Sequence, residues 1–314
     1  MSGAGFAEAL ASSRLGRNDK LEEIAAAVDW SSFAPVLAQL EPEGPGRPPF
    51  DPMLMFRAQL LARLYDLSDA ELEQQLNDRV SFRRFVGLGL SDEAPDHTTL
   101  CRFRNRLVAQ GLVQTLFDAF AAQLDRDGLF IKQGTILDAS LVRAARAKPD
   151  KQENAKDKDA AFAKKEGKPG SHYGYKIHVG MDQGSRLIRR ALATPANVND
   201  TTPADLLICG DEKAVYADRA YASRARREAL KARAIKDRIM HKTWGGGPRL
   251  TPHQARRNRL IAPRRAEVET IFAIFKHRLG FTATRYAGLA KTKAQLLMTA
   301  LAYNMRRAGR IAAA

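Results

Sequence analysis

The spacing of apolar residues changes near Gly128, and this change is the strongest constraint on how the chain can fold. Before it, apolar residues recur at intervals of three and four, as in 52–65 and 98–107, which predicts amphipathic helices. After it, short β-type runs occupy 135–141, 173–181, 187–193 and 214–217, with helical segments from Pro203 and over 223–234. We therefore predict a helical region over 1–128 and a core over 129–314, an α+β or α/β arrangement with a mixed sheet and flanking helices.

Two segments of the second region lack a regular pattern. Residues 144–171 are rich in Lys, Ala and Asp and end in Gly167-Lys168-Pro169-Gly170. Such a composition cannot bury itself, so we expect a mobile loop. Residues 244–263 contain the turn Gly245-Gly246-Gly247-Pro248 and a dense cluster of arginines, which predicts an irregular basic insertion.

Positive charge is concentrated in the last third of the chain. The whole sequence carries a net charge of +16, yet 23 Lys and Arg residues and only four acidic residues lie beyond Asp218, so residues 1–218 are slightly acidic. A basic block raises the local concentration of polyanions, and nucleic acid is the polyanion that such a protein most often meets. A solvated basic face without a partner is the alternative.

Two classes of protein are disfavoured by the sequence. No run of eighteen apolar residues exists, and residues 1–17 lack the charged start and apolar centre of a secretory signal, so we expect a cytoplasmic protein that does not enter a membrane. Cys101 and Cys209 have no Cys or His at metal-ligand spacing. We expect them to be small buried hydrophobes rather than part of a disulfide or a zinc site.

The helical region has the short helices and tight turns that a helix-turn-helix module requires. Ser68 and Glu71 have the spacing of a capping box, and residues 95–99 offer another helix start. The helix behind that second start carries three arginines among apolar residues, and we expect them to contact DNA: Arg102, Arg104 and Arg106. A plain helical bundle is the alternative.

Three carboxylates of the second region suggest a shared site. Asp138 and Asp218 each follow a short apolar run, which puts two charges at the ends of core strands, where oxygen ligands can converge on a hard cation such as Mg²⁺. On the helix expected from about Arg264, Glu269 shares a stripe with Arg265 and Lys276, whereas Glu267 faces away. Each acid taken alone has a simpler role, a cap or turn for the aspartates and an exposed pair with Arg265 for Glu269.

Three carboxylates of this kind suit phosphodiester chemistry. Cleavage of a phosphodiester is an in-line displacement, and two metal ions about 3.5 to 4 Å apart can activate the attacking oxygen and stabilise the leaving one. Water is the nucleophile when a strand is cut, and a liberated 3′-hydroxyl can be the nucleophile in a later step. One site can therefore both cut and join DNA.

Several longer strings resemble the DDE transposases of bacterial insertion sequences, specifically the insertion-sequence-five family. Those in the first region are Phe50-Asp51-Pro52, 64–69, 78–85, 95–99 and Phe103-Arg104. Those in the second region are 174–179, 194–200 and Ala217-Asp218-Arg219-Ala220-Tyr221. The resemblance spans most of the chain, and strings of this length are far more specific than a lone glycine motif.

The resemblance implies an RNase H-like core in which Asp138, Asp218 and Glu269 are the catalytic and metal-holding residues. Two Mg²⁺ ions are the implied cofactor, and Mn²⁺ is expected to substitute for them. The family signature of Tyr, Arg, Glu and Lys fits at Arg265, Glu269 and Lys276, but Ala262 stands at the Tyr position. The acid is intact, so we expect an active enzyme.

Other basic residues of the second region are candidates for phosphate contacts. The densest patch comprises Arg256, Arg257, Arg259, Arg264 and Arg265. Lys176 and His178 lie on a predicted strand, and Lys276 lies beside Glu269. We expect these side chains to contact the DNA backbone, although a solvated strand face explains Lys176 and His178 equally well.

The leading hypothesis is a transposase that binds the terminal inverted repeats of its own element, cleaves there and joins the ends to target DNA. It implies double-stranded DNA as partner, a homodimer that pairs two ends, association with the bacterial nucleoid, and no small-molecule substrate. An RNase H-like nuclease that does not join ends and a DNA-binding regulator without catalysis are the alternatives.

Overall fold

The computed structural model describes residues 17–40, 49–164, 170–243 and 249–313, which form two compact units. The helical unit comprises the described residues of Met1–Leu124 and Met298–Ala314, and the sheet unit comprises those of Asp125–Leu297. Within these described residues, no helix has the length and apolar character needed to cross a membrane. The sequence placed the boundary after residue 128 and kept residues up to 314 with the sheet, so the grouping of Met298–Ala314 differs from that expectation.

The helical unit is built from short helices, as the apolar spacing predicted. They are α2 (Asp19–Ala27), η1 (Trp30–Phe33), α3 (Ala34–Leu37), α4 (Pro52–Leu64), α5 (Asp69–Asp78), α6 (Val80–Val86), α7 (His97–Ala109) and most of α8 (Leu112–Arg126). The capping box of Ser68 and Glu71 is confirmed at the start of α5, and Asp96 caps α7 by accepting from the Thr99 amide. Side-chain oxygens at these positions satisfy amides that the first helical turn leaves unpaired.

Aromatic rings fill the core of the helical unit. Phe33, Phe56, Phe82, Phe103 and Phe120 are each at most 2% exposed. The rings of Phe33 and Phe56 lie 5.0 Å apart, and helices α4, α5 and α7 contact one another. Burial of such large rings supplies much of the stability of a small helical unit.

The sheet unit contains a six-stranded mixed sheet. Its strands are β1 (Thr135–Arg143), β2 (Ala161–Lys164), β3 (Ser171–Asp182), β4 (Ile188–Pro195), β5 (Ala214–Ala217) and β6 (Lys236–Ile239). β3 pairs antiparallel with β1, β2 and β4, whereas β5 pairs parallel with β1 and β6. The resulting order β4-β3-β1-β5-β6 is the RNase H-like arrangement that the resemblance implied.

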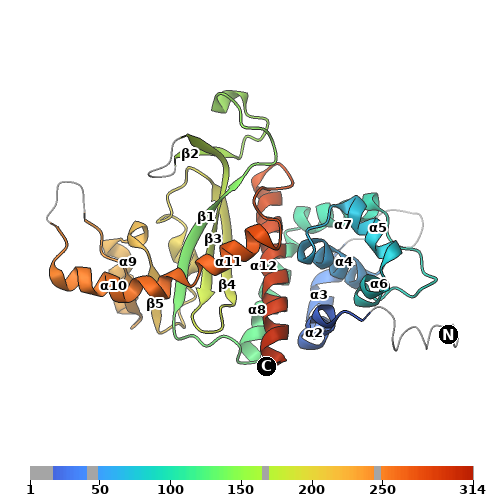
Figure 1. Ribbon diagram of the computed structural model, residues 1–314, viewed down its shortest axis with the longest axis horizontal. Coiled ribbons are helices and arrows are strands. Elements are labelled where there is room, and N and C mark those ends of the chain that lie inside the picture. Colours follow the sequence, from blue (N-terminus) through green and yellow to red (C-terminus); the bar gives the residue numbers. More distant parts are fainter. Residues whose placement is uncertain (1–16, 41–48, 165–169, 244–248, 314) are drawn as a thin grey trace. The chain divides into compact units, whose positions relative to one another are not determined.

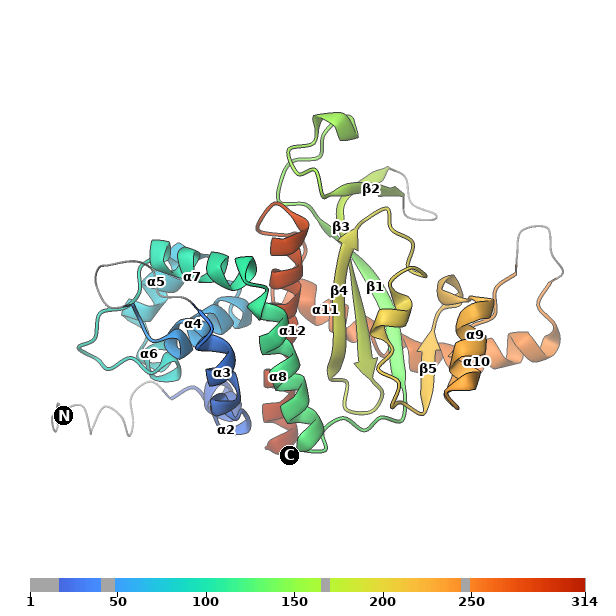
Figure 2. The ribbon, with the colours of Figure 1, turned by 180° about the vertical axis from the view of Figure 1, so that it is seen from behind.

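Helices cover the sheet, and two of them carry residues that contact β1. They are η3 (Ala204–Leu207), η4 (Arg219–Tyr221), α9 (Arg224–Ala232), α10 (Pro252–Ala266), α11 (Glu269–His277) and the first part of α12 (Leu289–Ala312). α10 and α11 run one after the other across one face of the sheet (Figures 1 and 2). An apolar core that includes Leu137, Val215, Tyr221 and Leu230 joins the strands to η4 and α9.

Each of the two segments expected to be irregular contains regular or buried structure. Residues 244–248 lie outside the described residues, but most of 249–263 forms α10, so an irregular insertion is wrong there. Thr251 and Gln254 form a capping box and Pro252 occupies the first turn, where proline is tolerated. Pro263 sits near the end of the same helix.

The expectation that 144–171 cannot bury itself is also wrong for part of the segment. Residues 165–169 lie outside the described residues, but Ala155, Asp157 and Ala160 are buried and β2 begins at Ala161. The buried carboxylate of Asp157 accepts hydrogen bonds from the Tyr175 hydroxyl and from the Gly288 amide. These partners are distant in sequence, so composition alone could not reveal them.

Candidate active site

Asp138 and Asp218 stand side by side because of the register between β1 and β5. Thr135 pairs with Val215 and Ile136 with Tyr216, and the same parallel register carried on by two residues brings Asp138 level with Asp218. β5 ends at Ala217, so Asp218 is the first residue beyond its carboxyl end. Asp138, in contrast, lies inside β1 rather than at the end of a strand as expected. Neighbouring strands are about 4.8 Å apart, so the two carboxylates share one edge of the site.

The environment of Asp138 disfavours its charged form. Its side chain is 13% exposed, its Oδ1 accepts from the Ala139 amide, and its Oδ2 pairs with Arg265 at 3.1 Å. Burial raises the pKa of Asp138 to about 6, with repulsion from Asp218 adding to the rise and Arg265 opposing it. A carboxylate held in this state gains from any further positive charge placed beside it.

Arg265 links Glu269 to the aspartates. One guanidinium nitrogen contacts Asp138 and another contacts Glu269 Oε1, each at 3.1 Å. The helix expected from about Arg264 is in fact two helices, since α10 ends at Ala266 and α11 begins at Glu269. Glu269 therefore stands in the first turn of α11 with its side chain 61% exposed, beside the aspartates but joined to them through Arg265.

The apolar face that was expected beside Glu269 is confirmed. Val268, Phe272, Phe275 and Leu279 are all buried, as the helical spacing predicted. Packing of this face fixes α11 on the sheet, which aims Lys276 along β1, where its ammonium donates to Ser140 Oγ at 2.7 Å. Arg265 and Lys276 thus both contact the strand that bears Asp138, and Glu269 contacts Arg265.

The residues present fit a divalent cation at this edge. Carboxylate oxygens are the ligands that hard ions prefer, and Asp138 and Asp218 bring two of them together with unfavourable mutual repulsion. The guanidinium of Arg265 already places positive charge between Asp138 and Glu269. Within the described part of the chain, the three acids do not all place a ligand oxygen within 4.8 Å of one another, and Glu269 is joined to Asp138 through Arg265.

Tyr221 and Asp200 lie in the same neighbourhood, although neither was expected among the site residues. Burial raises the pKa of Tyr221 well above its usual range, and Asp200, Asp138 and Asp218 reinforce the rise. Asp200 pairs with Lys176 at 2.7 Å. Both residues belong to strings that carried the resemblance, 194–200 and 217–221, and that was the signal that marked them.

Lys176 and His178 are placed differently from the expectation. His178 is fully buried, with Nε2 2.9 Å from Thr194 Oγ1, and burial lowers its pKa to about 4, so it is neutral near pH 7 and does not face a phosphate. Lys176 is 16% exposed and donates to the Val198 carbonyl while pairing with Asp200. Both side chains tie strand β3 to the segment 194–200, so the phosphate contacts expected for them are not supported.

The arginines of α10 divide into two groups. Arg257 donates to the Ile239 and Asp237 carbonyls at 2.7 and 2.6 Å, which makes it a structural clamp on β6 rather than a free phosphate contact. Arg256, Arg259 and Arg264 are exposed on the same helix. The exposed group keeps the charge and reach that a DNA backbone contact requires.

The arginines of α7 also divide. Arg104 is 16% exposed and forms an ion pair with Asp69 of α5, so it holds two helices together. Arg106 is half-buried, whereas Arg102 is exposed and makes no hydrogen bond or ion pair with the described residues. Arg102 is therefore the member of this trio that is best placed to meet a partner.

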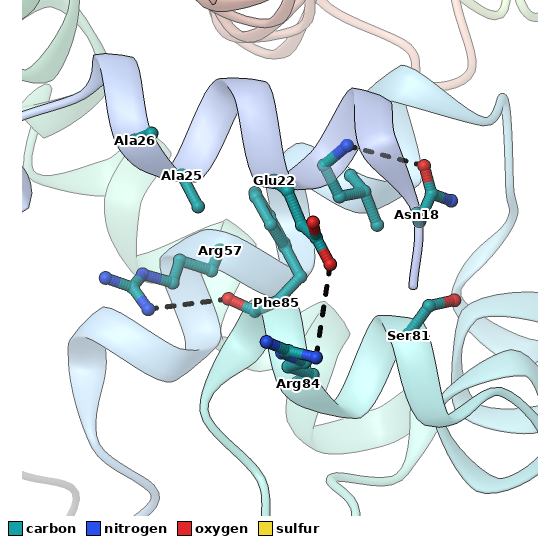
Figure 3. A pocket seen from close by; sticks show the side chains of 9 residues that line it. Asn18, Glu22, Ala25, Ala26, Arg57, Ser81, Arg84 and Phe85 are labelled. Atoms are coloured by element: carbon teal, nitrogen blue, oxygen red, sulfur yellow. Dashed lines mark hydrogen bonds and ion pairs between the residues drawn. The ribbon is translucent and has the colours of Figure 1, made fainter. Parts of the chain in front are cut away.

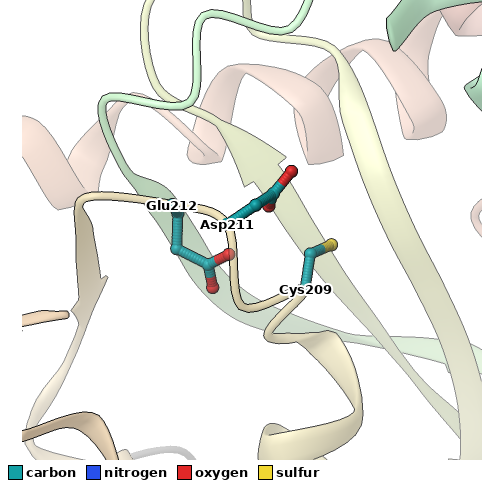
Figure 4. A group of neighbouring side chains, drawn as sticks. All are labelled: Cys209, Asp211 and Glu212. Atoms are coloured by element: carbon teal, nitrogen blue, oxygen red, sulfur yellow. The ribbon is translucent and has the colours of Figure 1, made fainter. Parts of the chain in front are cut away.

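Two further features have simpler roles. Cys209, Asp211 and Glu212 place their ligand atoms within 4.8 Å of one another (Figure 4). Arg189 contacts both acids, Asp211 at 2.6 Å and Glu212 at 3.6 Å, and Lys132 contacts Asp211 at 3.0 Å, so two positive charges offset the two negative ones. Cys209 is half-buried rather than fully buried, as is Cys101.

A pocket of about 350 Å³ lies in the helical unit between α2, α4 and α6 (Figure 3). Its polar walls are paired internally, because Glu22 contacts Arg84 at 4.0 Å and Arg57 donates to the Phe85 carbonyl. The guanidinium of Arg57 also stacks 4.2 Å from the centre of the Trp30 ring. We assign no ligand to this pocket.

The strand order of the sheet and the helices that flank it give this unit an RNase H-like fold. Residues 130–305 match the family model described as "Transposase DDE domain", and residues 10–106 match that described as "Transposase domain (DUF772)". The chain therefore belongs to the DDE transposase family. A solved structure of the piggyBac transposase synaptic complex with hairpin DNA is similar at a TM-score of 0.42 and 10% identity, over 96% of this chain and 75% of that one.

Proposed function

We propose that this transposase binds the terminal inverted repeats of its insertion sequence, cleaves the DNA there and joins the 3′-hydroxyl ends to target DNA. The observation that carries the proposal is the register that sets Asp138 beside Asp218, with Glu269 attached through Arg265. A pair of half-buried acids that repel each other suits a cation site better than a purely structural role.

The proposed roles follow from the positions of the side chains. Asp138, Asp218 and Glu269 hold two Mg²⁺ ions, which Mn²⁺ can replace. When bound, such ions activate the attacking oxygen and stabilise the leaving oxygen of an in-line displacement. Arg265 and Lys276 neutralise phosphate charge next to Asp138, and the exposed arginines of α10 bind the DNA backbone. A homodimer pairs the two ends of the element.

Strand transfer is the experiment that tests this proposal. Purified protein is incubated with a labelled DNA end from the flank of its own gene, a target plasmid, and Mg²⁺ or Mn²⁺. We expect a joined product that disappears with EDTA and with Asp138→Ala. Cut ends without joined product would replace the proposal by a nuclease, and DNA binding that is indifferent to metal and to Asp138, without any product, would replace it by a DNA-binding regulator.

Helix α7 is the element of the helical unit that we propose to enter a DNA groove. Thr98, Arg102 and Asn105 are exposed, and their spacing of four and three residues puts them on one face of the helix. Arginine, asparagine and threonine are side chains that can read base edges in the major groove. The opposite face is fixed by Arg104 on Asp69 and by His97 on Glu73.

Substitution of Arg102 by alanine is expected to weaken binding of the terminal DNA roughly tenfold, because a good base contact contributes about 1–3 kcal/mol. The melting temperature of this variant should stay close to that of the parent, since Arg102 is exposed and its attraction to Asp96 is screened by solvent. Arg104→Ala is the contrast: it leaves Asp69 without its ion pair and should lower the melting temperature. Fluorescence anisotropy at fixed salt and thermal melting separate the two, and equal DNA affinity for Arg102→Ala and parent would reject α7 as the reading helix.

A further inference from the structure

The hydroxyl group of Tyr221 is buried without a hydrogen-bond partner among the described residues. The residue is 1% exposed, and its ring belongs to the apolar core beneath β1 and β5. The hydroxyl itself is enclosed and has neither a donor nor an acceptor in reach. Buried hydroxyl groups are nearly always paired, so this exception asks for an explanation.

The tyrosine has little freedom to correct this by moving. Arg226 donates to the Tyr221 carbonyl at 2.6 Å, and Thr201 Oγ1 donates to the Ala220 carbonyl at 2.8 Å. Asp218 Oδ1 accepts from the Ala220 amide at 2.8 Å, which ties the same turn to the candidate metal site. The η4 turn therefore holds the hydroxyl at one place, in the electrostatic field of Asp138, Asp218 and Asp200.

An unpaired donor surrounded by carboxylates gains a strong bond if one oxygen shifts toward it, because hydrogen bonds to charged acceptors are stronger than neutral ones. We propose that Tyr221 is a positioning residue whose hydroxyl donates to a carboxylate oxygen of the Asp138–Asp218 pair when that pair holds its divalent ion. This inference rests on the proposed metal-holding role of the two aspartates. It gives Tyr221 the part of an outer-sphere partner, which orients a ligand without touching the ion.

Tyr175 supplies a matched control for this role. It is likewise a fully buried tyrosine of the sheet unit, but its hydroxyl donates to Asp157 Oδ1 at 2.7 Å. Tyr175→Phe therefore removes a hydrogen bond of the fold itself, whereas Tyr221→Phe removes a hydroxyl that makes no hydrogen bond to the part of the chain that the structure describes. The two substitutions delete the same atom from equally buried positions.

The test combines melting in EDTA with Mn²⁺ titration followed by electron paramagnetic resonance, on the full chain. In EDTA we expect Tyr221→Phe to melt at the parent temperature or above it, and Tyr175→Phe to melt below it, since an unpaired buried hydroxyl only costs stability. Mn²⁺ affinity should fall roughly 10-fold or more for Tyr221→Phe, in the range seen for outer-sphere partners, and stay unchanged for Tyr175→Phe.

Two results would overturn the role of Tyr221. One is parental Mn²⁺ affinity in Tyr221→Phe, and the other is a lowered melting temperature of that variant in EDTA, which would mean that the hydroxyl already has a structural partner. The Asp138→Asn variant distinguishes a failure of the Tyr221 role from a failure of the proposed function. If the parent and Asp138→Asn bind Mn²⁺ equally, the aspartates hold no ion and both ideas fail together.

Discussion

Asp138→Asn is expected to reduce metal-dependent DNA cleavage roughly 10³-fold or more. The amide keeps the shape of the side chain but loses the negative oxygen, and ligation of a catalytic ion contributes several kcal/mol to a transition state. Each 1.36 kcal/mol corresponds to a tenfold change in rate. Single-turnover cleavage of a labelled terminal DNA, with Mg²⁺ at saturating concentration, measures the effect.

The same variant should melt higher than the parent when metal is removed by EDTA at pH 8. Asp138 is charged at that pH although burial and Asp218 disfavour its charge, and the amide avoids this cost. Loss of activity together with raised stability would separate a chemical role from damage to the fold. A variant that retains cleavage within a few-fold of the parent would remove Asp138 from the catalytic set.

Arg226→Met is expected to lower the free energy of unfolding by about 2–4 kcal/mol and to impair cleavage as well. The Arg226 side chain is 3% exposed, contacts both carboxylate oxygens of Asp205, and donates to the Tyr221 and Thr201 carbonyls. Methionine fills the volume but leaves these carbonyls unpaired. Urea unfolding followed by circular dichroism measures the change.

Arg224→Met is the matched control for that substitution. Arg224 lies on the same helix and pairs with Glu228, but its side chain is 93% exposed, so the pair should contribute little to stability. An unchanged midpoint for Arg224→Met beside a large shift for Arg226→Met is expected. Similar small shifts of the urea midpoint for both variants would show that the hydrogen bonds of Arg226 do not stabilise the η4 turn.

The strands that carry the site could be predicted because each is a short apolar run with clear ends. β1, β3, β4 and β5 all lie where these runs were expected, and the β-type spacing before Asp138 and Asp218 was enough to suggest a shared edge. The sequence did not reveal β6, because Lys236–Ile239 is mostly polar and pairs through its backbone with β5. Backbone pairing leaves no trace in side-chain composition.

The basic candidates show a second limit of prediction from sequence. Charge alone marked His178, Lys176, Arg104 and Arg257, yet all four form contacts inside the fold. Their partners lie 16 to 35 positions away in sequence. These partners belong to other helices, strands or loops, which come together only when the chain folds. Exposed and structural arginines look alike until their neighbours are known.

The position of Glu269 was half predictable. Helical spacing correctly grouped it with Arg265, and the pairing weighed as its simpler role is present at 3.1 Å. The interruption between α10 and α11 could not be foreseen, since residues 264–269 contain neither glycine nor proline. Arg265 contacts Glu269 and Asp138 at once, so the simple pairing does not exclude the proposed role of Glu269 in the site.

Helix α12 has a consequence for the order in which the chain can fold during synthesis. Its residues from Met298 onward complete the helical unit, and Gly309 lies so close to the Glu23 backbone that an added Cβ would stand 3.1 Å from it. Translation adds roughly 5–20 residues per second, so the whole sheet unit must emerge, over about ten seconds or longer, before those residues exist. The helices of 17–124 can thus acquire their last packing partner only after the sheet unit has been synthesised.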